Sequence, residues 1–302
     1  MKKAGQRPVA GSEQAGPITK DEGKRKTMNT VGVIRNTEKD DSLGLAHRIE
    51  EYLLSQGKSC YISDTGEDLP PSCEAALVLG GDGTLLRAAK IVLERQLPLL
   101  GVNLGTLGYL AEISTDSLYE SIDLLLRGEY TVEKRMMLYG SVYSGGKKVY
   151  SDTALNDIVI RRVKQLRSFR ISSYVNGQHL NTYSADGVIV STATGSTGYS
   201  LSVGGPIVSP EAQIIMLTPL AAHSLSSRSI ILPGADLIRI QIDEGRSGLE
   251  DGVSRVGFDG EELVSVGVGD YIEIRRARLG ANIIKINNIS FLEVLRSKMT
   301  YN

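Results

Sequence analysis

Gly80-Gly81-Asp82-Gly83-Thr84-Leu85-Leu86 is the glycine-rich stretch that organises the first part of the chain. Residues 75–79 before it (AALVL) predict a buried strand of a parallel sheet, and residues 85–93 after it have the composition and apolar spacing of a helix. A strand, a glycine turn and a helix in this order gather backbone N–H groups and a helix N-terminus at one end of the strand. Because both attract negative charge, the stretch predicts a phosphate-binding turn that includes Gly80, Gly81 and Thr84.

Asp82 places a carboxylate in the middle of this predicted anion site. A carboxylate with no role at the site would only repel phosphate. A proton acceptor or a magnesium partner, by contrast, is chemically reasonable there. The alternative is that Asp82 only caps the helix. Arg87, in the first helical turn, is placed to reach phosphates, but an exposed surface arginine fits the position equally well.

Length, charge and composition limit the classes of protein to which the chain can belong. With 302 residues the chain is long enough for two domains, each with its own core. The formal net charge of −1 gives no electrostatic reason to expect nucleic acid as a partner, and the absence of tryptophan disfavours stacking on single-stranded nucleic acid. No apolar stretch is long enough to span a bilayer and no secretory signal is recognisable, so no membrane partner is expected.

The two cysteines, Cys60 and Cys73, are too few for a disulfide framework. Their spacing matches neither a metal site nor a redox pair. We therefore expect a protein of the reducing cytoplasm.

Three parts of the chain differ in pattern. Residues 1–27 are basic and polar with almost no large apolar residue, which predicts a disordered tail and makes Met28 a candidate for the native start. Residues 28–133 alternate strand-like and helix-like segments, which predicts an α/β domain with a parallel sheet. The expected strands are residues 31–34, 60–62, 75–79 and 98–102, and the expected helices are residues 45–53, 85–93 and 118–125.

Residues 134–282 have a β-type pattern. Hairpin turns are predicted at Gly145-Gly146, Asn176-Gly177 and Asp259-Gly260. Isoleucine alternates with polar residues at 238–242 and 272–274, as expected for strands with one buried face. This region is predicted to form an all-β sandwich. Residues 283–302 are predicted to return to the α/β domain, with a helix over 289–299 packing on it.

Common nucleotide-binding motifs are missing. The chain has no G-x-x-x-x-G-K-[ST] loop and no G-x-G-x-x-G after a strand, which excludes a P-loop mechanism and ordinary hydride transfer at the motif level. Two other stretches, residues 101–110 and 191–200, are rich in glycine or hydroxyl side chains. They suit loops that donate hydrogen bonds to ribose, phosphate or amide groups, although each alone is a weak signal.

Seven motifs follow one another in a specific order: Gly80-Gly81-Asp82-Gly83, residues 103–110, Leu155-Asn156-Asp157, Asp186-Gly187, Thr194-Gly195-Ser196-Thr197, Leu217-Thr218-Pro219 with His223, and Phe258-Asp259-Gly260. In this order they resemble the NAD kinase family, and the resemblance runs from about Val31 to the last helix. The glycine-aspartate turn alone also resembles lipid kinases and phosphofructokinases, whereas the hydroxyl-rich loop and the Asn156-Asp157 pair are more selective.

The resemblance implies ATP-dependent phosphorylation of the 2′-hydroxyl of the adenosine ribose of NAD, giving NADP. It implies a Rossmann-like first domain, a β-sandwich second domain and a site between them. NAD and ATP would be the substrates, and Mg²⁺ would arrive with ATP rather than on a dedicated protein ligand. No tightly bound organic cofactor is expected. The protein is expected to assemble into homodimers or homotetramers.

The resemblance also assigns residue roles. Asp82 would be the base that takes the hydroxyl proton. Asn156 and Asp157 would hold the adenine and ribose of NAD, and Asp186 would lie near the nicotinamide end or reach across a subunit contact. The other residues expected at NAD are Gly83, Thr197, Tyr199 and Ser202.

The hydroxyl-rich loop departs from the family pattern in two places. Ala193 stands where the family usually has proline, and Gly198 where it usually has alanine. Both changes increase the flexibility of the loop. They put in question how well the loop is pre-organised but not its chemistry.

Alternatives remain open from the residues alone. Asn156-Asp157 could start a turn, Asp186 could be a turn residue, and Tyr199 could serve packing only. The competing functions are a lipid or sugar kinase with the same glycine-aspartate turn, and a non-catalytic NAD sensor. The first is disfavoured by the lack of an evident membrane-binding face, and the second by the retention of a carboxylate at Asp82.

Deletion of residues 1–27 should leave the kinetic constants and the melting temperature almost unaltered, because the composition of this segment cannot support a packed core. Steady-state kinetics and thermal unfolding of the shortened chain measure this. A large loss of either property would identify the segment as a docking or assembly arm.

Overall fold

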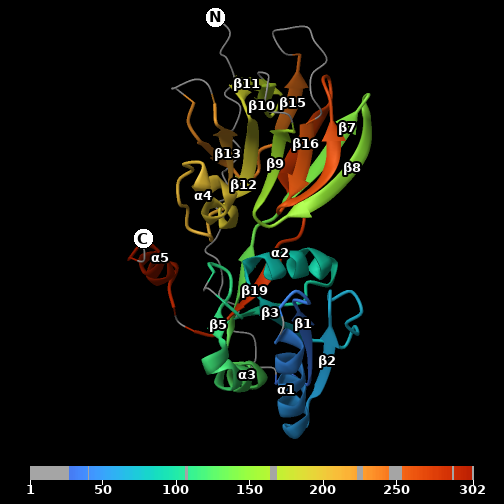
Figure 1. Cartoon of the computed structure of the whole chain (residues 1–302), viewed down its shortest axis with the longest axis vertical. Helices are drawn as coiled ribbons and strands as arrows, with labels where there is room; N and C mark the ends of the chain where they lie inside the picture. The colour runs from blue at the N-terminus through green and yellow to red at the C-terminus, as the bar shows by residue number, and fades with distance from the viewer. Residues whose placement is uncertain are drawn as a thin grey trace, which may run out of the picture.

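The computed structural model describes residues 27–39, 41–105, 108–163, 169–222, 227–244, 254–287 and 289–300. The predicted tail up to residue 26 and the motif residue His223 lie outside these ranges. Within them the chain forms an α/β region and a β-rich region (Figure 1). None of the helices in the described ranges is long and apolar enough to span a lipid bilayer.

The α/β region is built on one sheet with the order β2-β1-β3-β4-β19-β6, and β5 also pairs with β4. Strands β1 to β5 run parallel where they pair, β19 is parallel to β4, and β6 is antiparallel to β19. The strands are β1 (Thr30–Arg35), β2 (Ser59–Ser63), β3 (Ala75–Gly80), β4 (Leu99–Asn103), β5 (Ile113–Ser114), β6 (Thr131–Arg135) and β19 (Ala281–Lys285).

Helices cover both faces of this sheet. Apolar residues of α1 (Ser42–Ser55) and α3 (Leu118–Arg127) pack on one face, and those of α2 (Asp82–Ile91) pack on the other. Short 3-10 turns follow α2 (Leu93–Arg95) and precede α3 (Thr115–Ser117). Helix α3 ends at Gly128, which adopts the left-handed conformation that closes a helix C-terminus.

The β-rich region contains two antiparallel sheets. The first has the order β11-β10-β15-β18-β7-β8 and the second the order β14-β13-β12-β9-β16-β17. The first sheet contains β7 (Leu138–Ser144), β8 (Lys147–Ala154), β10 (Phe169–Val175), β11 (Gln178–Ala185), β15 (Ile238–Asp243) and β18 (Tyr271–Arg276); the second contains β9 (Asp157–Arg162), β12 (Gly187–Thr192), β13 (Ile214–Leu220), β14 (Ile230–Pro233), β16 (Ser254–Phe258) and β17 (Glu261–Val266).

Alternate residues of both sheets meet in one apolar core, which contains the isoleucines of 238–242 and 272–274. The predicted hairpin turns are confirmed at Gly145-Gly146, Asn176-Gly177 and Asp259-Gly260. Both residues of each turn have positive φ, between 50° and 88°. Such values match the two-residue turns that follow the twist of antiparallel strands.

The chain leaves the α/β sheet after Arg135 and re-enters it at Ala281, and these two residues are paired between β6 and β19. Residues 134, 135, 281 and 282, which the sequence pattern assigned to the second domain, therefore belong to the first sheet. The pattern did not predict β19 itself, which inserts between β4 and β6.

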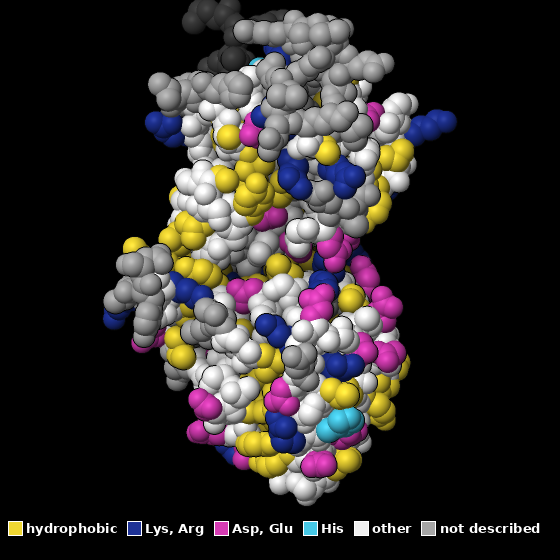
Figure 2. Space-filling view, viewed as in Figure 1, with side chains coloured by type: hydrophobic (Ala, Val, Ile, Leu, Met, Phe, Trp, Pro, Cys, Tyr) yellow, Lys and Arg dark blue, Asp and Glu magenta, His cyan; other side chains and the backbone are white. Residues whose placement is uncertain are grey.

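The last helix, α5 (Phe291–Thr300), follows β19 and lies at the side of the molecule in Figure 1. Lys298 lies over the ring of Tyr109, 5.4 Å from its centroid. Leu292 and Met299 remain exposed. The surface narrows where the α/β region meets the β-rich region (Figure 2), and the candidate site lies at this junction.

Candidate functional site

The glycine turn joins β3 directly to α2, as the sequence predicts. Gly80 ends the strand, Gly81 precedes the helix in an extended conformation, and Asp82 is the first helical residue. A Cβ atom on Gly80 would lie 2.3 Å from Oγ1 of Thr84, so only glycine lets the first helical turn fold back on the strand. Thr84 is buried, and its Oγ1 accepts a hydrogen bond from the side-chain amide of Asn36 at 3.2 Å.

Asp82 makes no capping hydrogen bond to its own helix. Its carboxylate instead accepts the backbone N–H groups of Tyr109 at 2.8 Å, Leu110 at 3.1 Å and Ala111 at 3.3 Å. A Cβ atom on Gly108 would overlap the same carboxylate. The helix-cap alternative is therefore not what the structure shows. A carboxylate accepts about four hydrogen bonds, so three amide donors leave capacity for a substrate hydroxyl.

A second carboxylate, that of Asp259, binds the turn that carries Asn156 and Asp157. It accepts the backbone N–H groups of Leu155 and Asn156 at 2.7 Å and of Asp157 at 3.1 Å. In return, the N–H of Asp259 donates to the carbonyl of Asp157 at 3.0 Å. Burial raises the pKa of Asp259, and the three amide donors act against that rise. The sequence analysis placed Asp259 in a hairpin turn and in a family motif but assigned it no role at the site.

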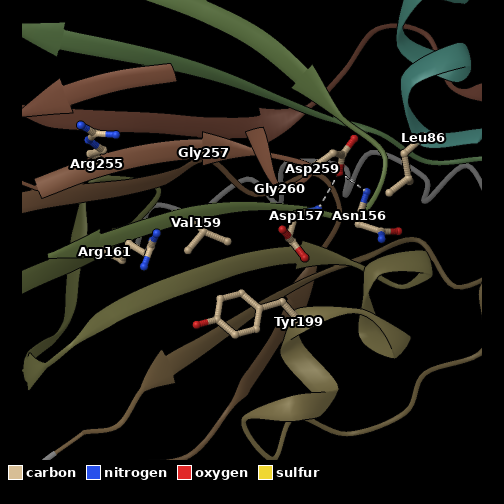
Figure 3. A pocket seen from close by; sticks show the side chains of 10 residues that line it. All are labelled: Leu86, Asn156, Asp157, Val159, Arg161, Tyr199, Arg255, Gly257, Asp259 and Gly260. Atoms are coloured by element: carbon tan, nitrogen blue, oxygen red, sulfur yellow. Dashed lines mark hydrogen bonds between the residues drawn. The ribbon is translucent and has the colours of Figure 1, made fainter. Parts of the chain in front are cut away.

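A cavity of about 400 Å³ opens next to this turn, within the size range of small-molecule sites (Figure 3). Alternate residues of β9 and of its neighbour β16 form its wall, on the side of the sheet opposite the apolar core. Leu86 of α2 completes it from the α/β region. The lining residues are Leu86, Asn156, Asp157, Val159, Arg161, Tyr199, Arg255, Gly257, Asp259 and Gly260.

Two polar groups at this cavity lack partners among the described residues. Oδ1 of Asn156 is buried and accepts no hydrogen bond. Asp157 is only 4% exposed, and no described residue donates a hydrogen bond to its carboxylate. Burial, and secondarily the charge of Asp259, raises the pKa of Asp157 to about 7. Both groups are acceptors, so a ligand that donates hydrogen bonds would satisfy them.

The hydroxyl-rich loop packs on the backbone of the same turn. It forms a 3-10 turn (Thr194–Thr197) followed by the short helix α4 (Tyr199–Ser202). A Cβ atom on Gly195 would lie 2.1 Å from the carbonyl oxygen of Asn156, so glycine is required for this approach. Thr192 links the loop to β9, because its Oγ1 donates to the carbonyl of Leu155 at 2.6 Å and accepts the N–H of Gly195 at 3.0 Å.

Of the remaining predicted residues, Tyr199 lies on the wall of the cavity and the others do not. Thr197 donates its hydroxyl to the carbonyl of Thr194 at 3.1 Å, and Ser202 is exposed. The glycine-turn residues and the exposed Arg87 also lie outside the lining, as does Asp82.

Asp186 is not among the residues that line the cavity, and it forms an ion pair with Arg162. In the register of β9 and β12, Asp157 is opposite Ser191 and Arg161 is opposite Gly187, which follows Asp186. Four residues along a strand span roughly 13 Å, so the structure does not bring Asp186 to the Asn156-Asp157 turn within one chain.

Three charged residues of the lining were not among the predicted site residues. Asp259 carried a signal in its motif, but its role depends on a partner about a hundred residues away. Arg161 and Arg255 are opposite one another in the register of β9 and β16 and add positive charge to the wall. No motif marked them.

No group of three or more His, Cys, Asp and Glu side chains suited to a metal ion occurs in the described ranges. Helix α2 is connected to the β-rich region by Lys90, whose ammonium lies 2.7 Å from Asp152 of β8. This ion pair helps to hold the helix that begins with Asp82 against the cavity.

Asp157→Asn should stabilise the ligand-free protein at about pH 8 but not at about pH 4. Between the ordinary carboxyl pKa of 3.8 and the folded value of about 7, the folded protein keeps a proton that the unfolded chain has released. The free energy of unfolding therefore falls as pH rises through this window. Asparagine removes that dependence. Denaturant unfolding across this range measures it, with the exposed Asp116→Asn as control; an equal effect at both pH values would contradict the explanation.

Comparison with known proteins identifies the family. A model of the ATP-NAD kinase N-terminal domain matches residues 56–130, and a model of the ATP-NAD kinase C-terminal domain matches residues 155–286. The chain is 43% identical over 293 residues to a NAD kinase of Lachnospira eligens, with 90% of this chain and 100% of the relative covered. It is 45% identical over 283 residues to a NAD kinase of Agathobacter rectalis, with 90% and 99% covered.

Solved structures share the fold. A yeast NADH kinase complexed with NADH superposes with a TM-score of 0.79 at 22% identity, covering 92% of this chain and 89% of that one. A NAD kinase from Archaeoglobus fulgidus in complex with ATP superposes with a TM-score of 0.73 at 24% identity, covering 90% and 99%. With both halves of the chain matched by family models and close relatives aligned along nearly its whole length, the chain belongs to the NAD kinase family.

Proposed function

We propose that this protein transfers the γ-phosphoryl group of ATP to the 2′-hydroxyl of the adenosine ribose of NAD, giving NADP. Membership of the NAD kinase family supports the reaction. The observation that carries the assignment in this chain is the pair Asn156 and Asp157, whose acceptor atoms lack donors at the cavity. Ribose hydroxyls and the adenine amine supply the donors that these acceptors need.

In the proposed mechanism, Asp82 is the base. Its remaining acceptor site takes the proton of the 2′-hydroxyl as the ribose oxygen forms a bond to the γ-phosphorus and the bond from that phosphorus to the bridging oxygen of ADP breaks. The amides of residues 109–111 donate hydrogen bonds to this carboxylate and fix its direction. Such a base contributes ~100- to 10,000-fold to the rate.

The phosphates of ATP would lie at the glycine turn, where the first amides of α2 and its dipole favour negative charge. Gly80, Gly81 and Thr84 shape that turn, and Arg87 is exposed on the same helix. Magnesium that arrives with the triphosphate would neutralise its charge. We assign no dedicated protein ligand to the ion, because the described ranges contain no group of three or more His, Cys, Asp and Glu side chains suited to a metal.

NAD would occupy the cavity. Asn156, Asp157 and Tyr199 lie on its wall, and Gly83, Thr197 and Ser202 would contribute from the turn and loop beside it. The opposed side chains of Arg161 and Arg255 provide positive charge that suits the pyrophosphate of a dinucleotide. Asp186 would lie near the nicotinamide end, within one chain or across a subunit contact, and we include assembly into homodimers or homotetramers in the proposal.

The two competing functions are less well supported. Family models for both halves of the chain are those of ATP-NAD kinases, which disfavours a lipid or sugar kinase. A sensor that only binds NAD would not need a carboxylate held with spare acceptor capacity beside a predicted phosphate site. A cytoplasmic location is part of the proposal and follows from the cysteine content.

Purified protein incubated with NAD, ATP and magnesium should form NADP, and EDTA should stop the reaction. A dehydrogenase specific for NADP detects the product. If a well-folded sample forms no NADP with ATP or other phosphoryl donors, the proposed function is wrong; NAD binding without turnover would support the sensor instead.

Asp82→Asn should lower turnover by at least ~100-fold, because asparagine cannot accept the hydroxyl proton. The melting temperature should fall modestly, since an NH₂ group would replace one oxygen that accepts amide N–H groups. Calorimetric NAD binding serves as the control for an intact site. Near-normal turnover would show that Asp82 holds the 109–111 segment without acting as the base.

A further inference from the structure

The segment that holds Asp82 is itself held by a second acidic residue. Asp82 accepts the amides of residues 109–111, and the next residue, Glu112, has a side chain only 2% exposed. The backbone N–H of Glu112 donates to the carbonyl of Gly101 on β4 at 3.0 Å. The main chain is therefore fixed on the sheet, and the buried carboxylate extends from it in a definite direction.

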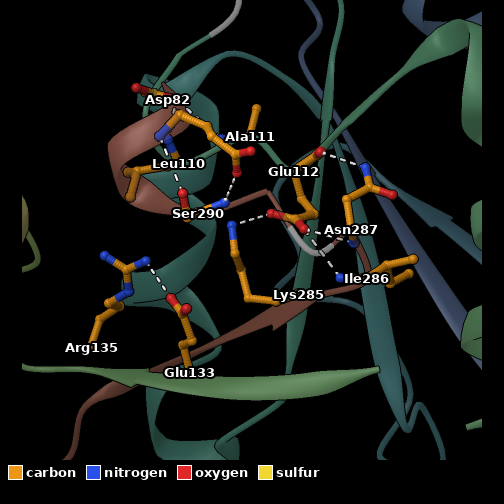
Figure 4. Close-up of polar contacts among 11 residues, drawn as sticks. Asp82, Leu110, Ala111, Glu112, Glu133, Arg135, Lys285, Ile286, Asn287 and Ser290 are labelled. Atoms are coloured by element: carbon orange, nitrogen blue, oxygen red, sulfur yellow. Dashed lines mark hydrogen bonds and ion pairs between the residues drawn. The ribbon is translucent and has the colours of Figure 1, made fainter. Parts of the chain in front are cut away.

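The partners of this carboxylate come from the last residue of β19 and the two residues that follow it (Figure 4). Lys285 forms an ion pair with one carboxylate oxygen of Glu112. The other oxygen accepts the backbone N–H groups of Ile286 at 3.2 Å and Asn287 at 3.0 Å. The side-chain amide of Asn287 donates in turn to the carbonyl of Glu112 at 3.2 Å. Four contacts thus join two segments that are more than 170 residues apart in sequence.

A buried ion pair is weak support for stability, because desolvation of the two charges offsets much of their attraction. What such a pair does supply is fixed geometry, since each hydrogen bond restricts one direction. Here the fixed geometry is that of residues 109–112. The amides of residues 109–111 in turn set the direction of the Asp82 carboxylate. Lys298 of α5 over the ring of Tyr109 connects the same C-terminal part of the chain to the segment at a second place.

We propose that Glu112 is a positioning residue for the phosphoryl transfer: it ties residues 109–111 to the end of β19 and thereby fixes Asp82 for proton acceptance. The proposal rests on the base role of Asp82 in the proposed function. In this proposal residues 285–287 contribute to catalysis indirectly. They bind Glu112 and do not touch the substrate.

The test begins with Glu112→Gln. Glutamine keeps the length of the side chain and one acceptor oxygen but removes the charge opposite Lys285. Misplacing a reacting group by about 1 Å costs up to ~100-fold in rate, so kcat should fall by ~10- to 100-fold while KM for NAD moves by less than about twofold. The matched control is Glu133→Gln, which breaks the ion pair with Arg135 on the same sheet (Figure 4) and should leave kcat near the parent value.

A double-mutant cycle separates positioning from general destabilisation. In an Asp82→Asn background, Glu112→Gln should cause no further loss of kcat, because the effect acts through Asp82. An equal loss in both backgrounds, or a lower melting temperature with unchanged kcat, would overturn the proposal. If Asp82→Asn itself has normal turnover, the base role and this inference both fail, whereas NADP formation by the parent protein still supports the reaction.

Asn287→Ala covers the case in which Glu112→Gln does not fold. This variant leaves the ion pair and removes only the side-chain amide that donates to the carbonyl of Glu112. A smaller loss of kcat at constant KM for NAD is expected. Unchanged kcat in a folded Asn287→Ala protein would count against positioning by this C-terminal segment.

Discussion

The candidate site depends on one interaction, the binding of three successive backbone N–H groups by the buried carboxylate of Asp259. Burying a carboxylate is unfavourable unless hydrogen bonds replace its hydration, and three amide donors do so here. The interaction fixes the turn at residues 155–157, from which β9 starts. It also brings a second carboxylate, Asp157, into a buried position whose cost appears as its raised pKa. The cost of burying the Asp157 carboxylate is electrostatic. It falls at the cavity, where a ligand with hydroxyl donors would relieve it.

The same arrangement occurs at three places in and around the candidate site. Asp259 binds residues 155–157, Asp82 binds residues 109–111, and Glu112 binds residues 286 and 287. In each case an acidic side chain on one element satisfies loop amides that no strand or helix would satisfy. Hydrogen bonds to a charged acceptor are short and directional, so loops held in this way are suited to positioning reactive groups. These three acidic residues therefore serve as structural acceptors, and Asp82 is the one to which we also assign a chemical role in the proposed function.

Features that depend on neighbouring residues were predictable. The strand, glycine turn and helix at residues 75–91 follow from apolar periodicity and from a close approach at Gly80 that only glycine allows. The hairpins follow from residue pairs that adopt positive φ, and the apolar core between the two antiparallel sheets follows from the alternation of isoleucine with polar residues. Strand β19 was not predictable in the same way, because insertion between β4 and β6 is decided by the register of a sheet whose other strands lie far away in sequence.

The sequence by itself determined the two types of region, the order of most elements and, through its motifs, the family. These properties are encoded in local spacing and residue type. Only the tertiary structure decided that Asp82 binds residues 109–111 rather than capping α2, that Asp186 pairs with Arg162, and that Asp259 organises the Asn156-Asp157 turn. The partners in these contacts are between 24 and 104 residues apart. Hydrogen bonds over such separations leave no periodic signal, because they depend on where the folded backbone brings each donor.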